Sequence, residues 1–153
     1  MTIKIPGYEI TGTIGEGGMA EVFLAEQQTL HREIALKVLF PSMAEDPQFG
    51  ERFLRETRII ASLPHPNIVP VYDAGIEGNH YYLAMEYLKA GCLSDRIKLG
   101  ISLEDAIQYT LDIAEALAFA HAQGFIHRDI KPDNVLFRTQ AKNAVLSDFG
   151  IAR

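Results

Sequence analysis

Apolar and polar residues alternate along much of the first half of the chain, a pattern typical of β-strands with one buried face. Three runs of this kind, 8–14, 21–25 and 33–39, are rich in β-branched and aromatic residues and lie between polar or glycine-containing turns. Two more, 68–72 and 81–87, follow later and are separated by a turn that contains glycine. The pattern therefore predicts a five-stranded antiparallel sheet.

A helical period of apolar residues interrupts the strands once and follows them once. The first helical stretch opens at Asp46 and Pro47 and stops before Pro64. The second begins where Ser102 can cap a helix and ends at Gly124. The apolar positions are Phe49, Phe53, Ile60 and Leu63 in the first stretch, and Leu103, Ile107, Leu111, Ala114, Leu117, Ala118 and His121 in the second. Strands grouped together before a long helix favour an α+β fold.

Two short apolar runs near the end of the chain, 135–137 and 144–147, flank the polar turn 138–143 and predict a hairpin of buried strands. In an antiparallel pair, the residue entering one strand lies opposite the residue leaving the other. We expect Asn134 to face Asp148 in this way, with their backbones roughly 5 Å apart. The hairpin would thus bring an amide oxygen and a carboxylate together.

The composition of the segment Leu88-Lys89-Ala90-Gly91 is that of a short, mobile connection, so we interpret it as a hinge. We expect residues 1–88 to form a first domain that contains the sheet and one helix. Residues 89–153, which contain the long helix and the short hairpin, would form the second domain.

At 153 residues the chain is long enough for one ordinary domain, and 48% hydrophobic with 22% charged residues indicates a globular protein, not a disordered one. Its 14 basic and 20 acidic residues leave a net charge of −6, which disfavours a nucleic-acid or anionic-membrane partner. The single cysteine, Cys92, excludes an internal disulfide and fits a reducing compartment. Because neither a membrane-spanning apolar run nor a basic-then-apolar leader is present, the sequence predicts a cytoplasmic location.

The loop before the hairpin carries side chains suited to metal and phosphate chemistry. Oxygen donors such as those of Asn134 and Asp148 suit Mg²⁺, whose shell is completed by phosphate oxygens and water. Asp129 precedes Asn134 on the same loop, and Lys131 between them supplies a cation. An acceptor carboxylate, a cation and two metal ligands are what phosphoryl transfer requires. The alternative is a polar loop that caps a hairpin, because turns favour Asp and Asn in any case.

The turn between the first two strands, Gly15-Glu16-Gly17-Gly18-Met19-Ala20, is rich in glycine. Glycines let a backbone approach a phosphate closely and turn its N–H groups inward. A strand follows this turn, whereas a dinucleotide fingerprint or a Walker loop would open a helix. A plain tight hairpin explains the same residues, so the turn alone does not decide between the two interpretations.

Lys37 lies inside the apolar third strand, where a lysine is seldom buried without a partner. It either protects a sheet edge or faces an anion. Glu56 falls on the inward flank of the first helix. An inward glutamate would explain an inward lysine, because either charge buried without a partner carries a large desolvation penalty. The alternative for Glu56 is an ordinary solvated helix face with arginine neighbours. The neighbours that can face water are Glu51, Arg52, Arg55 and Arg58.

Taken in order, these pieces resemble the protein kinases of the eukaryotic serine/threonine type. The matching stretches extend over essentially the whole chain: they are Ile14 to Val22, Ile34 to Lys37, Glu56, His127 to Asn134, and Asp148 to Gly150. The resemblance implies a protein-kinase-like fold, in which the sheet and one αC-type helix form the N-lobe and a mostly helical C-lobe begins after the hinge. The stretches around Gly17 and after Asp148 are similar to bacterial members of the family. Ala20 stands where the family has a third glycine.

The resemblance implies that the chain binds ATP and Mg²⁺. The glycine turn would cover the phosphates, and Lys37, held by Glu56, would grip the α and β phosphates. The residues expected around the nucleotide are Ile14, Gly15, Glu16, Gly17, Gly18, Val22, Ala35, Lys37, Glu86, Leu88 and Leu136. Asn134 and Asp148 would hold Mg²⁺.

The resemblance also implies the reaction, which is transfer of the γ-phosphate of MgATP to a serine or threonine of a protein substrate. Asp129 would orient the substrate hydroxyl and accept its proton, and Lys131 would steady the γ-phosphate. His127 is then structural and does not act as the base. In the family, an activation segment and further helices follow the Asp148-Phe149-Gly150 motif, so we expect apolar area on the long helix to be exposed here.

Three hypotheses follow from the sequence. The first is a serine/threonine protein kinase, of which this chain is the N-terminal portion of the catalytic domain. The second is a chain that only binds MgATP or acts as a non-catalytic scaffold. The third is a chain that does not fold stably alone. A sensor or regulatory domain outside this chain is compatible with all three.

Overall fold

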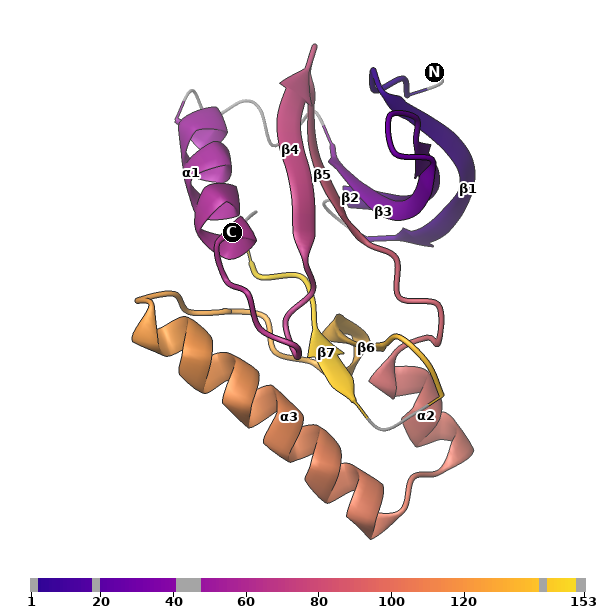
Figure 1. Ribbon diagram of the computed structural model, residues 1–153, viewed down its shortest axis with the longest axis vertical. Coiled ribbons are helices and arrows are strands. Elements are labelled where there is room, and N and C mark those ends of the chain that lie inside the picture. The colour runs from indigo at the N-terminus through magenta and orange to yellow at the C-terminus, as the bar shows by residue number, and fades with distance from the viewer. Residues whose placement is uncertain (1–2, 18–19, 41–47, 141–142, 151–153) are drawn as a thin grey trace. The chain divides into compact units, whose positions relative to one another are not determined.

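The structure is a computed structural model that describes residues 3–17, 20–40, 48–140 and 143–150. Its chain divides into two compact units (Figure 1). The first contains the residues up to Ala61 together with Val71–Tyr87, and the second contains Ser62–Pro70 together with the residues from Leu88 onward. No helix among the described residues has the length and apolar character needed to cross a membrane.

The first unit is a five-stranded antiparallel sheet with one helix, as the alternating pattern predicts. Its strand order is β1-β2-β3-β5-β4. The strands are β1 (Tyr8–Glu16), β2 (Ala20–Gln27), β3 (Arg32–Leu39), β4 (Val71–Glu77) and β5 (His80–Glu86). Helix α1 (Phe49–Ala61) packs beside β4. The expected helix start at Asp46 and Pro47 lies outside the described residues.

One face of this sheet forms the core of the unit. Ile34, Leu36 and Val38 of β3 alternate along the strand and are almost completely buried, together with Phe23 and Ala25 of β2. Because side chains alternate between the two faces of a strand, the residues between these positions point to the opposite face. That opposite face is the one that carries the lysine of β3.

The sheet curls so that its two edge strands meet, and Figure 1 shows the strong bend of β1. The hydroxyl of Tyr8 on β1 donates a hydrogen bond of 2.7 Å to Oδ2 of Asp73 on β4. The Tyr8 ring also packs edge-on against Tyr82, with 5.9 Å between the ring centroids. Burial and the neighbouring carboxylate raise the pKa of the Tyr8 hydroxyl, so it remains a donor.

The second unit is built from helices and a short hairpin. Its elements are α2 (Leu93–Leu99), α3 (Leu103–Ala122), the 3-10 turn η2 (Pro132–Asn134), β6 (Val135–Phe137) and β7 (Ala144–Leu146). The start of α3 is capped as expected, because Ser102 Oγ accepts a hydrogen bond of 3.0 Å from the Asp105 N–H. Gly124, the expected stop, has a left-handed φ of 77° that favours glycine. Helix α2 was not predicted, since its seven residues are too few to display a helical period.

Helix α3 does not bury the face that its apolar period suggests. The buried residues are Tyr109, Asp112, Ala116 and Ala120, which pack beside β7. Leu103 is 78% exposed, and Ile107 and Leu111 are each about half exposed. The exposed apolar area that the family resemblance implied is therefore observed on this helix.

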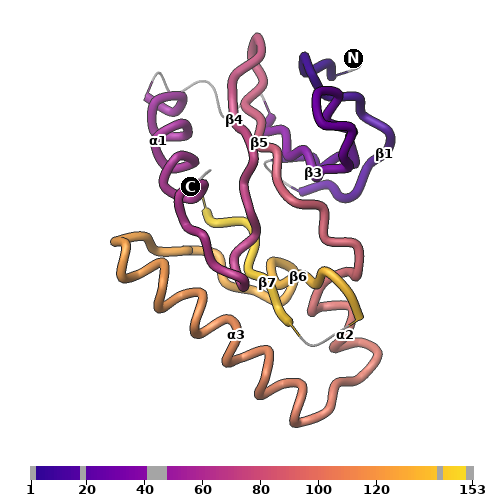
Figure 2. The backbone as a smooth tube through the Cα atoms, in the orientation of Figure 1, coloured from indigo at the N-terminus to yellow at the C-terminus, as the bar shows by residue number. Residues whose placement is uncertain are grey.

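The residues before β4 differ from the prediction. A strand was expected over 68–72, but β4 begins only at Val71. Ile68 and Val69 instead lie along β7, where the Val69 N–H donates to the Leu146 carbonyl at 2.9 Å. Figure 2 shows the segment between α1 and β4 passing beside β7. Pro70, which has no N–H to donate, separates the two segments. Residues 62–70 accordingly pack in the second unit, whereas the sequence analysis assigned them to the first domain.

Candidate active site

His127 forms the centre of the loop that precedes the hairpin. Its Nε2 donates to the Ser147 carbonyl at 2.7 Å, and its Nδ1 accepts from the Asp129 N–H at 3.2 Å. Only 1% of the residue is exposed, and this burial lowers the pKa of the imidazole. The neutral ring therefore links the loop to the end of β7 and fixes the backbone of Asp129. The expectation of a structural histidine agrees with this geometry.

Asp129, Lys131 and Asn134 come together in the structure. The Asn134 Nδ2 donates to the Asp129 carbonyl at 2.7 Å and to its carboxylate Oδ2 at 3.0 Å. The Lys131 Nζ lies 3.5 Å from the same Oδ2. The Asp129 side chain is 23% exposed, so the carboxylate is oriented by its neighbours and still reaches solvent. A merely solvated turn would need no such arrangement.

The hairpin forms as predicted, but its register differs by one residue from the expectation. Val135 pairs with Leu146 and Phe137 with Ala144. Extending this register outward places Asn134 opposite Ser147, and the Ser147 N–H donates to the Asn134 carbonyl at 2.8 Å. Asp148 lies one residue farther on. The expected direct pairing of Asn134 with Asp148 is therefore wrong. Val135 pairs with Leu146, so the residue opposite Asn134 is Ser147.

Backbone strain is concentrated around this loop. Arg128 has a φ of 68° and Asp148 a φ of 55°, in the left-handed region that non-glycine residues rarely adopt. Such residues cost of the order of 1–3 kcal/mol each and persist only where the surroundings hold them. The Gly150 N–H donates to the His127 carbonyl at 2.9 Å. A Cβ on Gly150 would stand 3.1 Å from that same oxygen, so the segment after Asp148 is held tightly against the loop.

The oxygen donors in this unit suit Mg²⁺ that also binds phosphate and water. They do not suit a metal ion held by protein side chains alone. No group of three or more His, Cys, Asp or Glu side chains within the described ranges could hold a metal ion. Asn134 uses its Nδ2 for hydrogen bonds, which leaves its Oδ1 directed elsewhere. An amide oxygen and a carboxylate are hard donors, and Mg²⁺ commonly takes only one or two such groups and completes its shell with phosphate and water. Asn134 and Asp148 carry one donor of each of these two kinds.

In the first unit, the register of the sheet aligns three of the candidate residues across neighbouring strands. Gly15 of β1 pairs with Val22 of β2, and Val22 pairs with Lys37 of β3. Directly paired residues share a face of the sheet, and Ala35 shares it too because it is two positions from Lys37. These residues lie on the face opposite the buried core, where Lys37 is half-buried.

The glycine turn closes a hairpin, since the Gly17 N–H donates to the Ala20 carbonyl at 2.9 Å. A Cβ on Gly15 would meet no described atom within 4 Å, and its φ lies outside the left-handed region that requires glycine. Neither packing nor backbone conformation within the described chain therefore explains glycine at this position. A ligand that approaches the backbone closely would explain it. Gly18 lies outside the described residues.

The remaining candidates are distributed over several elements. Ile14 is 44% exposed on β1, and Glu16 pairs with Glu21 at the end of the first hairpin. Glu56 is half-buried on α1 in the same unit as Lys37. Glu86 is the last residue of β5 and pairs with Ile34, and Leu88, two residues later, is buried. Leu136 lies in β6, where it pairs with Val145.

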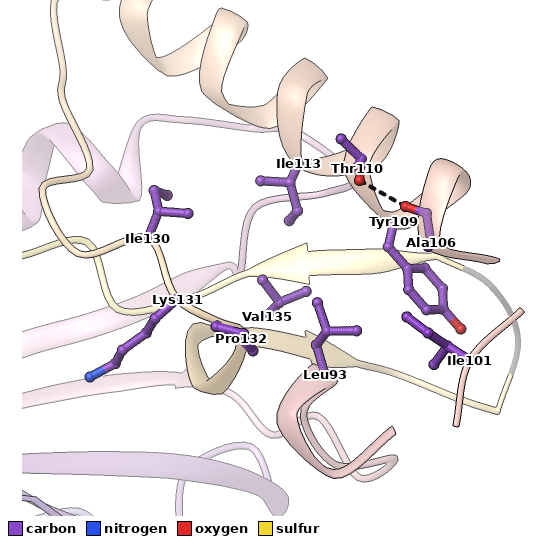
Figure 3. A pocket seen from close by; sticks show the side chains of 10 residues that line it. All are labelled: Leu93, Ile101, Ala106, Tyr109, Thr110, Ile113, Ile130, Lys131, Pro132 and Val135. Atoms are coloured by element: carbon purple, nitrogen blue, oxygen red, sulfur yellow. Dashed lines mark hydrogen bonds between the residues drawn. The ribbon is translucent and has the colours of Figure 1, made fainter. Parts of the chain in front are cut away.

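A separate apolar pocket of about 360 Å³ lies in the second unit (Figure 3). Leu93, Ile113 and Val135 are among the side chains that line it. Lys131 also lines it, but Figure 3 shows its amine extending away from the other lining residues. Its walls are mostly apolar and the Lys131 amine extends away, so the lining residues offer no charged group to the phosphates of a nucleotide.

Sequence reasoning missed two residues that support the loop. Ser147 was assigned only to a strand, yet its carbonyl accepts from His127 and its hydroxyl donates to the Asn134 carbonyl at 3.1 Å. Asp112 of α3 accepts a hydrogen bond from the first residue of β7, Ala144, at 2.8 Å. The only signal in the sequence was a carboxylate at helical spacing from the small residues Ala116 and Ala120.

The chain is similar to several bacterial proteins that are named serine/threonine-protein kinases. The serine/threonine-protein kinase PrkC of Bacillus subtilis (strain 168) is 44% identical over 147 residues, which cover 95% of this chain and 22% of PrkC. PknB of Mycobacterium leprae (strain TN), also named a serine/threonine-protein kinase, is 44% identical over 153 residues, covering 95% of this chain and 24% of PknB. The chain thus spans less than a quarter of the length of these two relatives.

Solved structures give the same result for the fold. The crystal structure of the kinase domain of Mycobacterium tuberculosis PknI matches with a TM-score of 0.83 and 34% identity, covering 99% of this chain and 62% of that chain. This likeness confirms the expected kinase fold, with the sheet and the first part of the helical lobe. The family model for the protein kinase domain matches residues 8–153. On this match, which extends over nearly the whole sequence, the chain belongs to the protein kinase family.

Proposed function

We propose that this protein is an ATP-dependent serine/threonine protein kinase, which transfers the γ-phosphate of MgATP to a serine or threonine hydroxyl of a protein substrate. The observation that carries the proposal is the cluster of Asp129, Lys131 and Asn134, ordered by the buried His127. The relatives named serine/threonine-protein kinases support the same reaction. No nucleic acid is required as a partner.

In this proposal the first unit binds the nucleotide. The backbone N–H groups of the glycine turn cover the phosphates, which is consistent with the open space around Gly15. Lys37 contacts the α and β phosphates, and Glu56 holds the lysine amine in place. Ile14, Val22 and Ala35 contact the adenine from this unit. Glu86, at the end of β5 in the same unit, offers a hydrogen-bonding backbone group to the adenine edge.

The second unit performs the chemistry. Asp129 accepts the proton of the substrate hydroxyl while that oxygen attacks the γ-phosphorus, and the bond to the bridging oxygen of ADP breaks. The Asn134 amide and the Asp129 N–H bond to His127 hold the carboxylate for this transfer. Lys131 stabilises negative charge on the transferred group. Mg²⁺, held by Asn134 and Asp148, supplies charge neutralisation at the phosphates when it is bound.

Replacing the proposed base tests the function. We expect Asp129→Asn to lower the single-turnover rate of phosphate transfer to a protein acceptor by about 10²- to 10⁴-fold, the usual contribution of general base catalysis. The neighbouring Asp133→Asn is the matched control, because Asp133 is exposed on the same loop and has no role in the proposal. The assay measures transfer of labelled γ-phosphate at saturating MgATP.

Two results would contradict the proposal in different ways. Equal rates for Asp129→Asn and wild type would reject Asp129 as the base. Binding of MgATP by the wild type without any transfer to protein would favour the non-catalytic binding or scaffold role. Binding is measured by calorimetry with a non-hydrolysable ATP analogue.

A further inference from the structure

Strand β7 is short, yet the polar backbone groups on its outer edge are all satisfied. This edge is the one that faces away from β6, and its groups belong to Ala144 and Leu146. The Leu146 N–H donates to the Asn67 carbonyl at 2.8 Å, and the Leu146 carbonyl accepts from the Val69 N–H at 2.9 Å. These two bonds are ordinary backbone pairs between neighbouring strands. At Ala144 no neighbouring strand supplies partners, and side chains take that place.

Both polar groups of Ala144 are bonded to buried side chains. Its N–H donates to Oδ2 of Asp112 on α3 at 2.8 Å, and its carbonyl accepts from Nδ2 of Asn67 at 2.7 Å. Asp112 and Asn67 are each 7% exposed, and Ala144 is completely buried. A buried N–H or carbonyl that loses its partner is strongly destabilising, so each of these bonds fixes the strand.

Asp112 is an unusual residue for this position. Its carboxylate lies on the buried face of α3 and, within the described chain, its two oxygens bond to amides: Oδ2 to the Ala144 N–H, and Oδ1 to Gln108 Nε2 at 2.9 Å. Carboxylates are rarely buried without a cation unless they accept several hydrogen bonds. A carboxylate is expected at this buried position if the fold requires an acceptor for the Ala144 N–H.

The strand that Asp112 holds leads directly to the proposed metal ligand. Asp148 lies four positions after Ala144, about 13 Å of extended chain. Over this distance the chain is rigid, since Val145 and Leu146 are fully buried and Ser147 is bonded to Asn134 and His127. A displacement of Ala144 would therefore be transmitted to Asp148 and would not be absorbed between them.

We propose that Asp112 is a positioning residue for the metal site, which fixes the start of β7 and thereby sets the location of the Asp148 carboxylate. Asn67 acts with it on the carbonyl of the same residue, Ala144. This inference rests on the proposed function, because it assumes that Asp148 binds Mg²⁺ together with a nucleotide. Asp112 itself touches neither nucleotide nor metal.

The test compares nucleotide affinity with and without Mg²⁺ in three variants of the protein. Asp112→Leu removes the acceptor, and we expect its affinity for ADP with Mg²⁺ to fall about tenfold, as for other residues that orient metal ligands. Its affinity for ADP in EDTA should remain within twofold of wild type. Asp112→Asn keeps an acceptor oxygen and should restore the Mg²⁺-dependent affinity. Glu115→Leu, an exposed acid on the same helix, is the control and should match wild type.

Amide hydrogen exchange provides a readout that does not depend on ligand. We expect the Ala144 amide to exchange faster in Asp112→Leu than in wild type, and to be protected again in Asp112→Asn. Asn67→Ala removes the other bond to Ala144 and should give the same selective loss of Mg²⁺-dependent affinity. It replaces Asp112→Leu if that variant does not fold.

The outcomes separate this inference from the proposed function. If wild type binds ADP equally well with and without Mg²⁺, the proposed metal site fails and the inference fails with it. In the other case, wild type binds ADP more tightly with Mg²⁺, while Asp112→Leu and Asn67→Ala weaken ADP binding equally with Mg²⁺ and in EDTA, or weaken neither. Either result refutes only the positioning role. An Asp112→Asn variant as weak as Asp112→Leu would also refute it, because the charge and not the hydrogen bond would then matter.

Discussion

At the residue scale, His127 offers its two ring nitrogens to different neighbours, and only the neutral ring can serve both. Nε2 carries the proton that it donates to Ser147, so Nδ1 must hold the lone pair that accepts the Asp129 N–H. Protonation would convert Nδ1 into a donor and break the bond to Asp129. Although the carboxylates of Asp129 and Asp148 favour the proton, burial outweighs them and lowers the pKa of the imidazole.

The lowered pKa of His127 predicts how stability depends on pH. Between the ordinary histidine value of about 6.5 and the lower folded value, the unfolded chain binds a proton that the folded chain does not. The free energy of unfolding should therefore fall as pH drops through this window, by at most about 1.4 kcal/mol per pH unit. Urea unfolding at pH 7.5, 6.5 and 5.5 measures this slope. The variant His127→Gln should show a flatter slope, and an unchanged slope would contradict the assignment.

How far sequence predicts single residues depends on how local their contacts are. Asp129, Lys131 and Asn134 lie within six residues of each other, and their clustering follows from a loop that turns back on itself. Asp112 lies 32 residues from Ala144, and no periodicity indicates that its carboxylate will meet that backbone N–H. The register error at Asn134 has another origin: residues 135–137 and 144–146 are all apolar, so no alternation of apolar and polar residues specifies which residues pair.

At the element scale, α1 buries a hydroxyl that makes no hydrogen bond to any residue that the structure describes. Phe49, Phe53, Thr57 and Ile60 form the buried face of the helix. Thr57 is 3% exposed, and its Oγ1 has no hydrogen-bond partner among the described residues. An unsatisfied buried hydroxyl is destabilising, whereas a methyl group of the same size would not be.

Thr57→Val should therefore stabilise the protein, by about 1 kcal/mol. Valine keeps the shape and the β-branching of threonine, so helix propensity changes little. The matched control is Thr110→Val on α3, because the Thr110 hydroxyl is exposed and donates to the Ala106 carbonyl at 2.7 Å. Urea denaturation measures both, and the control should not gain stability. A loss of stability in Thr57→Val would indicate that the hydroxyl is bonded in solution.

The elements themselves were largely predictable because each has a regular apolar period. Strands β1, β2 and β3 start within a residue of the predicted positions, and the Ser102 cap is confirmed. The segment before β4 could not be predicted from its pattern. Ile68 and Val69 are apolar and β-branched like strand residues, but they pair with β7 of the second unit and not with β5.

At the scale of the whole molecule, and within the residues that the structure describes, the chain crosses between its two compact units three times, after Ala61, Pro70 and Tyr87. Local sequence patterns predict one crossing, at the hinge, because a composition shift marks only that one. The other two depend on the hydrogen bonds that Asn67 and Val69 make with β7. Assignment of a segment to a unit is a property of tertiary contacts, which the local pattern does not contain.

The curl of the five-stranded sheet is the other large-scale feature, and one side-chain hydrogen bond links its two edge strands. The Tyr8 hydroxyl donates to Asp73 Oδ2 at 2.7 Å across 65 residues of sequence. A hydrogen bond to a carboxylate contributes about 1.5–3 kcal/mol when desolvated. Because Asp73 is exposed, we expect Tyr8→Phe to cost about 1 kcal/mol, while the ring keeps its contact with Tyr82.

Tyr72→Phe is the matched control for this closure. The Tyr72 ring lies under the guanidinium of Arg32, 3.6 Å from its carbon, and that contact does not need the hydroxyl. Urea unfolding should therefore distinguish a destabilised Tyr8→Phe from a nearly unchanged Tyr72→Phe. Amide exchange should show the loss of protection in β1 first, because β1 is an edge strand whose remaining backbone partner is β2 alone. Equal stability of the two variants would mean that backbone pairing suffices to hold the curled sheet.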